Sequence, residues 1–545
     1  MKMTIPRLVT KRNILFIFLA ISISIMNMMR VIIGFMNMPP GQTYLATGHY
    51  YQDYFEYAQF IAQGTFGHHF IENQFTVFDP SKTLLGWGIY LGIGKIAGLL
   101  GLSPFLAYWI VVFLFSMIVC VIFFVIVNHI LSPLPYLHRI IAFLFSIFAT
   151  PFVKIVDDGL WTIIPYDFFY APMSIFHRLG SVPHHGAATI GTGIGILLMS
   201  RIVNTMTNHG KRLFVPVILT LFVLSVLLTF NPLQVINLMT TFGIVCFFYF
   251  FHTRIKNTKK KQFVSVFVFM GLFLTCIAFL INTSHKSTEI FTRTVSWEIA
   301  QQQIVSWKMI LLTLGPIVFL VPFGIKKYFS HITPIKFFIF FLPIVSYIYY
   351  VSPFAGYFGT FNQRFFTPYT FVLLAILAVY GIRTLQNFFP RFRIFTSIII
   401  LCYLVYFLFC TLSISRSLPS CDSFCYVPNS LVTGMKMLDT QKDDKAVLTS
   451  PSGSLGMILP IFTDRHVYLG RIIFTPNIEE KSYFSELFYR GNMTDTDARN
   501  LLKDNHIGYV IFSFREPYVR QNLEKYSFLK IFYENDQVIL YKFVE

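Results

Sequence analysis

Two carboxylates stand among aromatic residues in the stretch GHYYQDYFEYAQF, which follows an apolar run long enough to cross a bilayer. At helical spacing Tyr50, Tyr54 and Tyr57 share one face. Asp53 and Glu56 share a neighbouring face, which predicts a short amphipathic helix on the membrane with its acids turned toward the protein. The plainer interpretation is a solvated helix whose acids face water. An ionised carboxylate at an apolar boundary is costly unless it is paired or used, so both acids are candidates for chemistry.

Cationic side chains that could hold an anionic leaving group occur in two later loops. The segment HRLGSVPHHG contains Arg178, His184 and His185, with small residues beside them that would let a lipid headgroup approach. An interfacial polar cap explains the two histidines equally well. The segment FGTFNQRFFTPY places Arg364 just before another apolar run. An arginine there needs an anionic partner, either a carboxylate or a lipid phosphate, and we favour the phosphate.

Two further acidic segments complete the set of candidates. In FDPSKTLLGW, Asp79 and Lys82 flank a proline at the start of a glycine-rich run. Asp157 and Asp158 end a later apolar run, where they could hold a divalent cation such as Mg²⁺ or Mn²⁺ together with Asp53. Adjacent acids point in different directions along a helix, which weakens that hypothesis.

The composition identifies the setting in which these residues work. Of 545 residues, 55% are hydrophobic, 18% aromatic and only 12% charged, which is typical of a membrane protein. The formal charge of +18 does not indicate nucleic-acid binding, because the basic residues fall in short clusters between apolar runs. Clusters of that kind set membrane topology.

Eleven apolar runs predict an α-helical polytopic membrane protein with about eleven spans. We expect the spans near 13–35, 105–130, 139–156, 187–207, 213–230, 233–251, 263–281, 306–325, 335–352, 367–386 and 394–414. The run 83–102 contains several glycines and Lys95, and we expect it to be interfacial or re-entrant. The basic clusters then all fall on the cytoplasmic side, which predicts a cytoplasmic N-terminus and an outer C-terminus.

The C-terminal part of the chain has a different composition, with ordinary charge density and short alternating apolar segments. It predicts a small extracytoplasmic α/β accessory domain at 415–545, preceded by a transmembrane catalytic domain at 1–414. Cys421 and Cys425 could form a local disulfide if they face an oxidising compartment.

The arrangement of these motifs resembles a known superfamily. A first span, an outer loop with an early acidic residue, and an Asp-Pro-x-Lys segment leading into a glycine-rich helix resemble the GT-C glycosyltransferases, which use polyprenyl-phosphate sugars. The nearest likeness is to the protein-mannosyltransferase and aminoarabinose-transferase-like members. The resemblance implies that Asp53 is the catalytic base and that DPSKTLLG corresponds to the family's HPPLGK-like segment. This chain has Gln52-Asp53-Tyr54 instead of an adjacent Asp-Glu pair, and one proline where two are common.

We therefore expect a membrane glycosyltransferase, hexosyl or pentosyl, that moves a sugar from a polyprenyl-phosphate donor to an acceptor hydroxyl with inversion. The acceptor would be a glycan, lipid or protein on the outer face of a plasma (inner) membrane. The expected substrate-binding residues are Glu56, Asp79, Lys82, Arg178, His184, His185 and Arg364.

Two alternatives stay open. The first is a lipid-linked glycan ligase or polymerase that uses histidine and arginine without a carboxylate base. The second is a lipid or solute transporter, which fits less well because the polar groups gather at one rim rather than in mid-membrane.

Overall fold

The computed structural model describes most of the chain in two compact units. The bundle unit comprises Met1–Met28, Val112–Asn282 and Trp297–Leu418, and the loop-tail unit comprises Met29–Val111, Thr283–Ser296 and Pro419–Glu545. Outside the described residues lie 1–10, 48–50, 78–81, 84–85, 157–161, 167–174, 208–212, 253–256, 286–288, 303–305, 390–392, 418–424, 453–454 and 545. The predicted boundary at 414/415 is not the boundary between these units, because the first outer loop belongs with the tail.

Long apolar helices dominate the described residues and confirm a polytopic helical membrane protein. Seven are long and apolar enough to cross a bilayer. They are α1 (Lys11–Met36), α4 (Pro104–Ile130), α7 (Pro183–Thr207), α9 (Pro232–His252), α10 (Asn257–His285), α14 (Pro334–Val351) and α16 (Tyr369–Phe388). An eighth span would be the pair formed by α12 (Trp307–Leu314) with η1 (Pro316–Leu320) and α13 (Val321–Tyr328), which bends by 86°.

Four more apolar segments are helical but shorter. They are α3 (Gly88–Leu100), α5 (Tyr136–Phe148), α8 (Phe214–Phe230) and the apolar part of α17 (Arg393–Ser417). The eleven predicted spans fall on α5, α8 and α17, the seven long helices and the bent pair. Helix α3 corresponds to the run 83–102, which we expected not to cross. The 13 residues of α3 give about 20 Å of helix, less than the roughly 30 Å hydrocarbon core. The predicted span 139–156 is wrong in its second half, because the helix ends before Pro151 and strand β4 (Val153–Val156) follows, paired with β5 (Thr162–Pro165).

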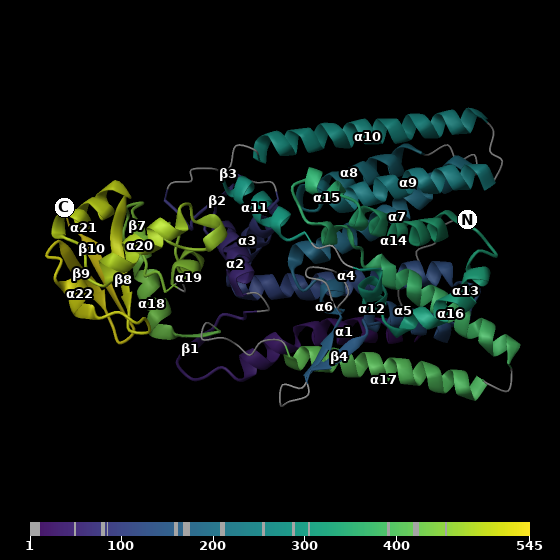
Figure 1. Cartoon of the computed structure of the whole chain (residues 1–545), viewed down its shortest axis with the longest axis horizontal. Helices are drawn as coiled ribbons and strands as arrows, with labels where there is room; N and C mark the ends of the chain where they lie inside the picture. Colours follow the sequence, from purple (N-terminus) through teal and green to yellow (C-terminus); the bar gives the residue numbers. More distant parts are fainter. Residues whose placement is uncertain are drawn as a thin grey trace. The chain divides into compact units, whose positions relative to one another are not determined.

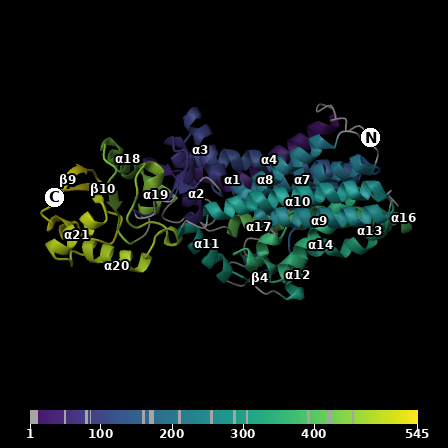
Figure 2. The ribbon, with the colours of Figure 1, turned by 90° about the horizontal axis from the view of Figure 1, so that it is seen from above.

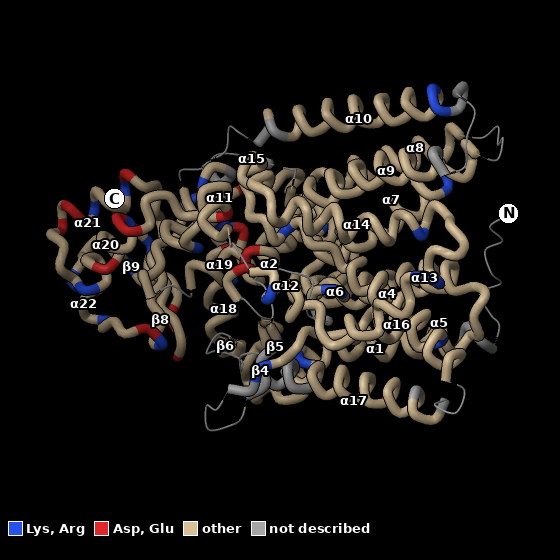
Figure 3. Tube along the Cα trace, turned by 45° about the vertical axis from the view of Figure 1, so that its right-hand side comes forward, with Lys and Arg blue, Asp and Glu red and all other residues tan. Residues whose placement is uncertain are grey.

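The bundle unit is built around neighbouring helices that bury their apolar faces on one another. Helices α7, α8, α9 and α14 run side by side (Figures 1 and 2). Only 11% of the apolar window of α10 is buried, so most of that helix is left for lipid. Lys and Arg residues gather where α10 begins and α13 ends (Figure 3). The positive-inside rule predicts that this end of the bundle is cytoplasmic.

The loop-tail unit joins the first loop to the end of the chain by backbone pairing. Strand β1 (Gln42–Tyr44) pairs antiparallel with β6 (Tyr426–Pro428). Cys425, directly before β6, is disulfide-bonded, and Cys421 lies outside the described residues. In the same loop, β2 (Ile71–Glu72) pairs with β3 (Lys82–Thr83).

Helix α2 (Tyr51–Thr65) carries the predicted acids and is enclosed by protein. The helix itself is confirmed, and its residues are buried continuously from Tyr54 to Gly64. Its predicted position at the membrane surface stays a prediction. It packs against α3 and against α19 (Leu455–Phe462) of the tail. Its contact with α3 is close because Gly64 faces Gly94, and Tyr57 stacks on Tyr90 with ring centroids 4.6 Å apart.

The tail forms a small α/β structure, as predicted. A four-stranded sheet has the order β7 (Ala446–Leu448), β8 (Ile507–Ser513), β10 (Val538–Phe543), β9 (Leu529–Glu534). Strands β7 and β8 are parallel, and the other pairs are antiparallel. The remaining helices are α18 (Asn429–Met437), α20 (Ile478–Tyr489), α21 (Asp495–Asp504) and α22 (Arg520–Glu524).

A buried acid lies where the two parallel strands end. Glu516 follows β8, and its carboxylate oxygens are buried near Ser450 and Ser452, which follow β7. Burial raises the pKa of Glu516 to about 7, and the two serine hydroxyls offset part of this effect. The folded tail therefore favours a protonated Glu516.

Glu516→Gln should make the stability of the protein less dependent on pH. In the wild type, the folded state binds the proton of Glu516 more tightly than the unfolded state does. The stability that this gives is fully present below the unfolded pKa, near 4.5, and is lost as the pH rises through the folded pKa, about 7. The variant should therefore match the wild type near pH 5 and be more stable at pH 8 by about 3 kcal/mol. Thermal unfolding of the purified protein against pH measures this. The exposed Glu479→Gln is the control, and equal pH profiles for wild type and Glu516→Gln would contradict the assignment.

Gly94→Ala should loosen α2 from α3. A Cβ at Gly94 would collide with the carbonyl oxygen of Ile61, whereas a Cβ at Gly92 on the same helix meets nothing within 4 Å. Overpacking of this kind costs roughly 1–3 kcal/mol. Thermal unfolding should show a loss for Gly94→Ala and little change for Gly92→Ala. Equal stability of the two variants would show that the helices are not held this closely.

Candidate functional site

A buried arginine joins the two predicted acids in the loop-tail unit. Arg471 forms ion pairs with both Asp53 and Glu56. The side chain of Arg471 is 8% exposed, that of Glu56 3% and that of Asp53 22%. The guanidinium also lies over the ring of Phe474, 5.4 Å from its centroid. The acids are turned toward the protein, as predicted, and of the two only Asp53 retains appreciable contact with solvent.

Local structure explains why these three side chains meet. Asp53 lies in the first turn of α2, where the helix dipole favours a negative charge, and Glu56 follows one turn later on the same face. Arg471 directly precedes the short helix η5 (Ile472–Phe474). Burial lowers the pKa of Arg471, and the neighbouring Asp53 opposes that effect. A buried guanidinium of this kind requires anionic partners, and α2 supplies two.

Polar contacts continue along α2 and fix it further to the tail. Gln59 donates from its amide nitrogen to the amide oxygen of Gln74 at 2.7 Å. Gln74 in turn donates to a carboxylate oxygen of Asp464 at 2.7 Å, and Nε2 of His68 lies 2.8 Å from the same carboxylate. Gln59 and Gln74 therefore form a second polar link between the first loop and the tail.

In the bundle unit, Arg364 has a carboxylate partner. It forms an ion pair with Glu298, which lies in the last turn of α11 (Glu289–Ala300), and Thr360 also donates to that carboxylate. Glu298 is the only Asp or Glu among the described residues of this unit. The sequence predicted an anionic partner for Arg364 and favoured a phosphate, whereas the structure supplies this acid.

The segment that carries Arg364 is held by amide side chains. Gln234 donates to the backbone carbonyls of residues 364–366 at 3.1–3.3 Å, and Asn237 donates to that of Phe365 at 2.7 Å. Ser346 donates to the same Phe365 carbonyl. These bonds fix the short helix η2 (Asn362–Phe365) against α9 and α14.

Arg364 and the histidines line one small cavity. The cavity has a volume of about 60 Å³, and its lining includes His177, His185, Asn231, Gln234 and Arg364. That volume is below the roughly 300 Å³ at which small-ligand pockets begin, so it can admit only a group of a few atoms. His184 is buried behind it, with its ring centroid 4.4 Å from that of His185. The structure thus brings together three of the predicted cationic residues.

Arg178 has a different environment. It is fully buried, and its guanidinium donates to the carbonyls of Ser146 and Ala149 at the C-terminal end of α5. The ring of Phe371 lies 4.0 Å from its guanidinium carbon. A cation at a helix C-terminus stabilises the helix. These contacts give Arg178 a structural role, and its predicted contact with the substrate stays a prediction.

For the remaining predicted site residues, the described part of the structure gives no side-chain contacts. Asp79, Asp157 and Asp158 lie outside them, and of Lys82 only the backbone, in β3, is described. Among the residues that the structure describes, no group of three or more His, Cys, Asp or Glu side chains could hold a metal ion. The divalent-cation hypothesis stays a prediction.

Sequence reasoning missed Arg471. It lies 418 residues from Asp53, in the segment RHVYLGRI of the tail. The one signal in the sequence is an arginine between apolar residues, and this signal does not identify a partner.

Comparison with solved structures establishes that the fold is shared with GT-C glycosyltransferases, as the sequence predicted. The Archaeoglobus fulgidus oligosaccharyltransferase matches with a TM-score of 0.55 and 10% identity over 92% of this chain and 69% of its own. ArnT from Cupriavidus metallidurans, bound to undecaprenyl phosphate, matches with a TM-score of 0.51 and 11% sequence identity. The match covers 97% of this chain and 98% of ArnT. The mycobacterial arabinofuranosyltransferase AftD matches with a TM-score of 0.57 and 10% sequence identity. The match covers 98% of this chain and 42% of AftD.

At these identities the likeness concerns the fold. No protein-family model and no curated protein matches the sequence.

Arg471→Met should destabilise the protein strongly. It would leave Glu56 buried without its cation, and breaking a buried ion pair from one side costs roughly 3–5 kcal/mol. Thermal unfolding measures the loss, and adding Glu56→Gln to Arg471→Met should restore part of it. The control is Arg490→Met, which breaks the solvent-exposed pair with Glu486 and should change little. If Arg471→Met unfolds like the wild type, the pair is not a structural constraint.

Proposed function

We propose that this protein is a membrane glycosyltransferase that moves a sugar from a polyprenyl-phosphate donor to an acceptor hydroxyl on the extracytoplasmic face. The N-terminus would be cytoplasmic, and the loop-tail unit would lie outside the membrane. The transfer would invert the anomeric configuration, with Asp53 as the general base. The shared fold supports the class of reaction, and the paired acids of α2 support the residue.

The observation that carries the proposal is the unequal exposure of the two acids that share Arg471. A general base must reach the acceptor proton, directly or through one water. Asp53, at 22% exposure, meets that requirement, whereas Glu56, at 3%, does not. We therefore assign the base to Asp53 and a positioning role to Glu56, in place of the substrate contact that the sequence suggested for Glu56.

The arginine between the acids suits a base that must be held in one orientation. The guanidinium of Arg471 pairs with Asp53, and Glu56, which pairs with the same guanidinium, holds Arg471 in place.

The transfer itself needs one bond made and one broken. The acceptor oxygen attacks the anomeric carbon from the side opposite the phosphate while its proton passes to Asp53. The bond between the anomeric carbon and the phosphate oxygen breaks, and polyprenyl phosphate leaves with the electron pair. Arg364 and His185, on the small cavity of the bundle unit, are the proposed phosphate contacts. Arg364 would exchange Glu298 for the phosphate, while the buried His184 and Arg178 support the site structurally.

Solved relatives in fold support the chemical classes. ArnT was crystallised with undecaprenyl phosphate, and the Archaeoglobus oligosaccharyltransferase with a tethered acceptor peptide and, separately, with Zn and sulfate. A lipid-phosphate donor is therefore the proposed ligand of this chain. A divalent cation held by Asp157 and Asp158 with Asp53, and donor contacts from Asp79 and Lys82, are kept as proposals.

Asp53→Asn should abolish turnover without abolishing donor binding. Loss of a general base typically costs 10²–10⁴-fold in rate. The measurement uses purified protein with a panel of polyprenyl-phosphate sugars, and it records bound donor and released polyprenyl phosphate separately. Gln52→Ala, on the adjacent residue, is the control. Survival of turnover in Asp53→Asn would instead support the ligase or polymerase that uses histidine and arginine. Absence of donor binding in the wild type would refute the proposed function.

A further inference from the structure

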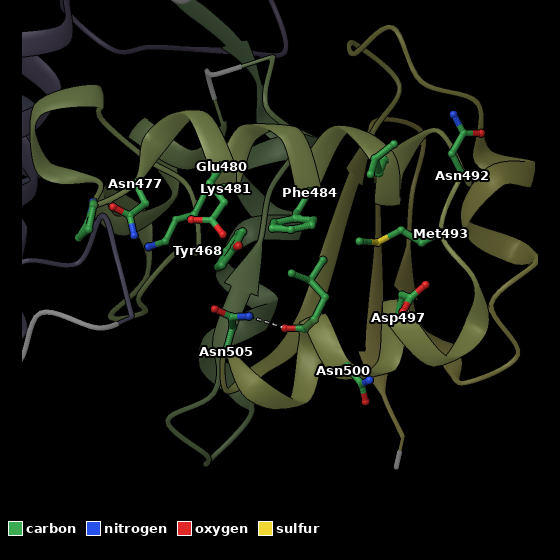
Figure 4. Close-up of a pocket in the computed structure, with 13 residues that line it drawn as sticks. Tyr468, Asn477, Glu480, Lys481, Phe484, Asn492, Met493, Asp497, Asn500 and Asn505 are labelled. Atoms are coloured by element: carbon green, nitrogen blue, oxygen red, sulfur yellow. Dashed lines mark hydrogen bonds between the residues drawn. The ribbon is translucent and has the colours of Figure 1, made fainter.

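The tail contains a cavity that the proposed chemistry does not use. Its volume is about 650 Å³, within the roughly 300–1,000 Å³ of small-ligand sites. Helix α20 lines one side of the cavity with Glu480, Phe484 and Leu487, which are spaced so that they share one helix face. Helix α21 lines another side with Asp497, Asn500 and Leu501 (Figure 4). All of its lining residues belong to the tail.

The cavity has an apolar floor and a polar rim. The floor is formed by Tyr468, Phe484, Leu487, Met493 and Leu501, all buried or half-buried. The rim is formed by the exposed side chains Asn477, Glu480, Asn492, Asp497 and Asn500. Figure 4 shows Phe484 between the two polar ends of the cavity.

Most of the rim is available to a ligand. Lys481 donates to the hydroxyl of Thr76 at 2.8 Å, and Asn505 donates to the carbonyl of Leu501 at 2.8 Å. By contrast, the side chains of Asn477, Glu480, Asn492 and Asn500 make no hydrogen bond to any residue that the structure describes. Each amide offers two donors and an acceptor, and each carboxylate offers acceptors only.

This combination matches the chemistry of a saccharide. Neighbouring hydroxyl groups of a sugar ring both donate and accept, as side-chain amides do, and carboxylates accept from them. The apolar face of the ring packs on an aromatic side chain, here Phe484. Two exposed acids, Glu480 and Asp497, disfavour a phosphate or nucleic-acid ligand. A peptide would be expected at a sheet edge or in a groove with apolar anchor pockets, which this rim does not resemble.

We propose that this cavity binds a neutral oligosaccharide and that it is the acceptor-glycan site of the tail. The second clause rests on the proposed function, whereas the first stands on the lining alone. The tail is then a recognition domain rather than a passive cover.

Binding of neutral trisaccharides to the full-length purified protein tests the inference without requiring turnover. Fluorescently labelled mannotriose, maltotriose and cellotriose are the saccharide probes, and a labelled Ser/Thr-rich nonapeptide is the peptide probe. At least one trisaccharide should bind at millimolar or lower concentration. Phe484→Ala should weaken that binding by about tenfold, and Asn500→Ala should weaken it from the opposite helix. Tyr483→Ala, an exposed aromatic on the same helix outside the cavity, should leave it unchanged.

The outcomes separate this inference from the proposed function. Asp53→Asn should bind the trisaccharide like the wild type, so loss of catalysis does not remove the signal. The inference is overturned if no trisaccharide binds, if only the peptide binds, or if Phe484→Ala and Asn500→Ala both bind like the wild type. Saccharide binding without turnover on any polyprenyl-phosphate sugar would uphold the site while refuting the transferase.

Discussion

The loop-tail unit depends on one interaction, the placement of Arg471 between Asp53 and Glu56. A guanidinium that is almost fully buried is stable only with anionic partners, and an acid as buried as Glu56 is stable only with a cation. Neither half of the arrangement can exist without the other. The first loop and the tail therefore fold as one structure, in which α2 packs on α19 and is enclosed by protein.

In the bundle unit, too, an arginine is paired with an acid, although this unit contains fewer charged residues. Glu298 and Arg364 form a pair, and the segment with Arg364 is held by Gln234, Asn237 and Ser346. The neutral amides and the hydroxyl fix the backbone of residues 364–366, and Glu298 pairs with the guanidinium of Arg364. The position of this cation is therefore determined before any ligand binds.

The sequence predicted those features that depend on local composition. Apolar length identified the helices of the bundle, and short alternating apolar segments indicated the α/β character of the tail. Aromatic neighbours drew attention to Asp53 and Glu56. The misses are of two kinds. The span at 139–156 failed at Pro151, where continuing hydrophobicity concealed a change from helix to strand. Arg471 was missed because its significance comes from Asp53 and Glu56, which lie far away in the sequence, and composition does not encode such partners.

The pairing of β1 with β6 has a consequence for biosynthesis. Thr43 meets Asn429 across 386 residues, so the first loop emerges from the ribosome long before its partner strand exists. During that interval Asp53 and Glu56 lack Arg471, and the apolar face of α2 lacks the contact with α19. The first loop can therefore reach its folded form only after the tail has been synthesised, because β6 and Arg471 both lie in the tail.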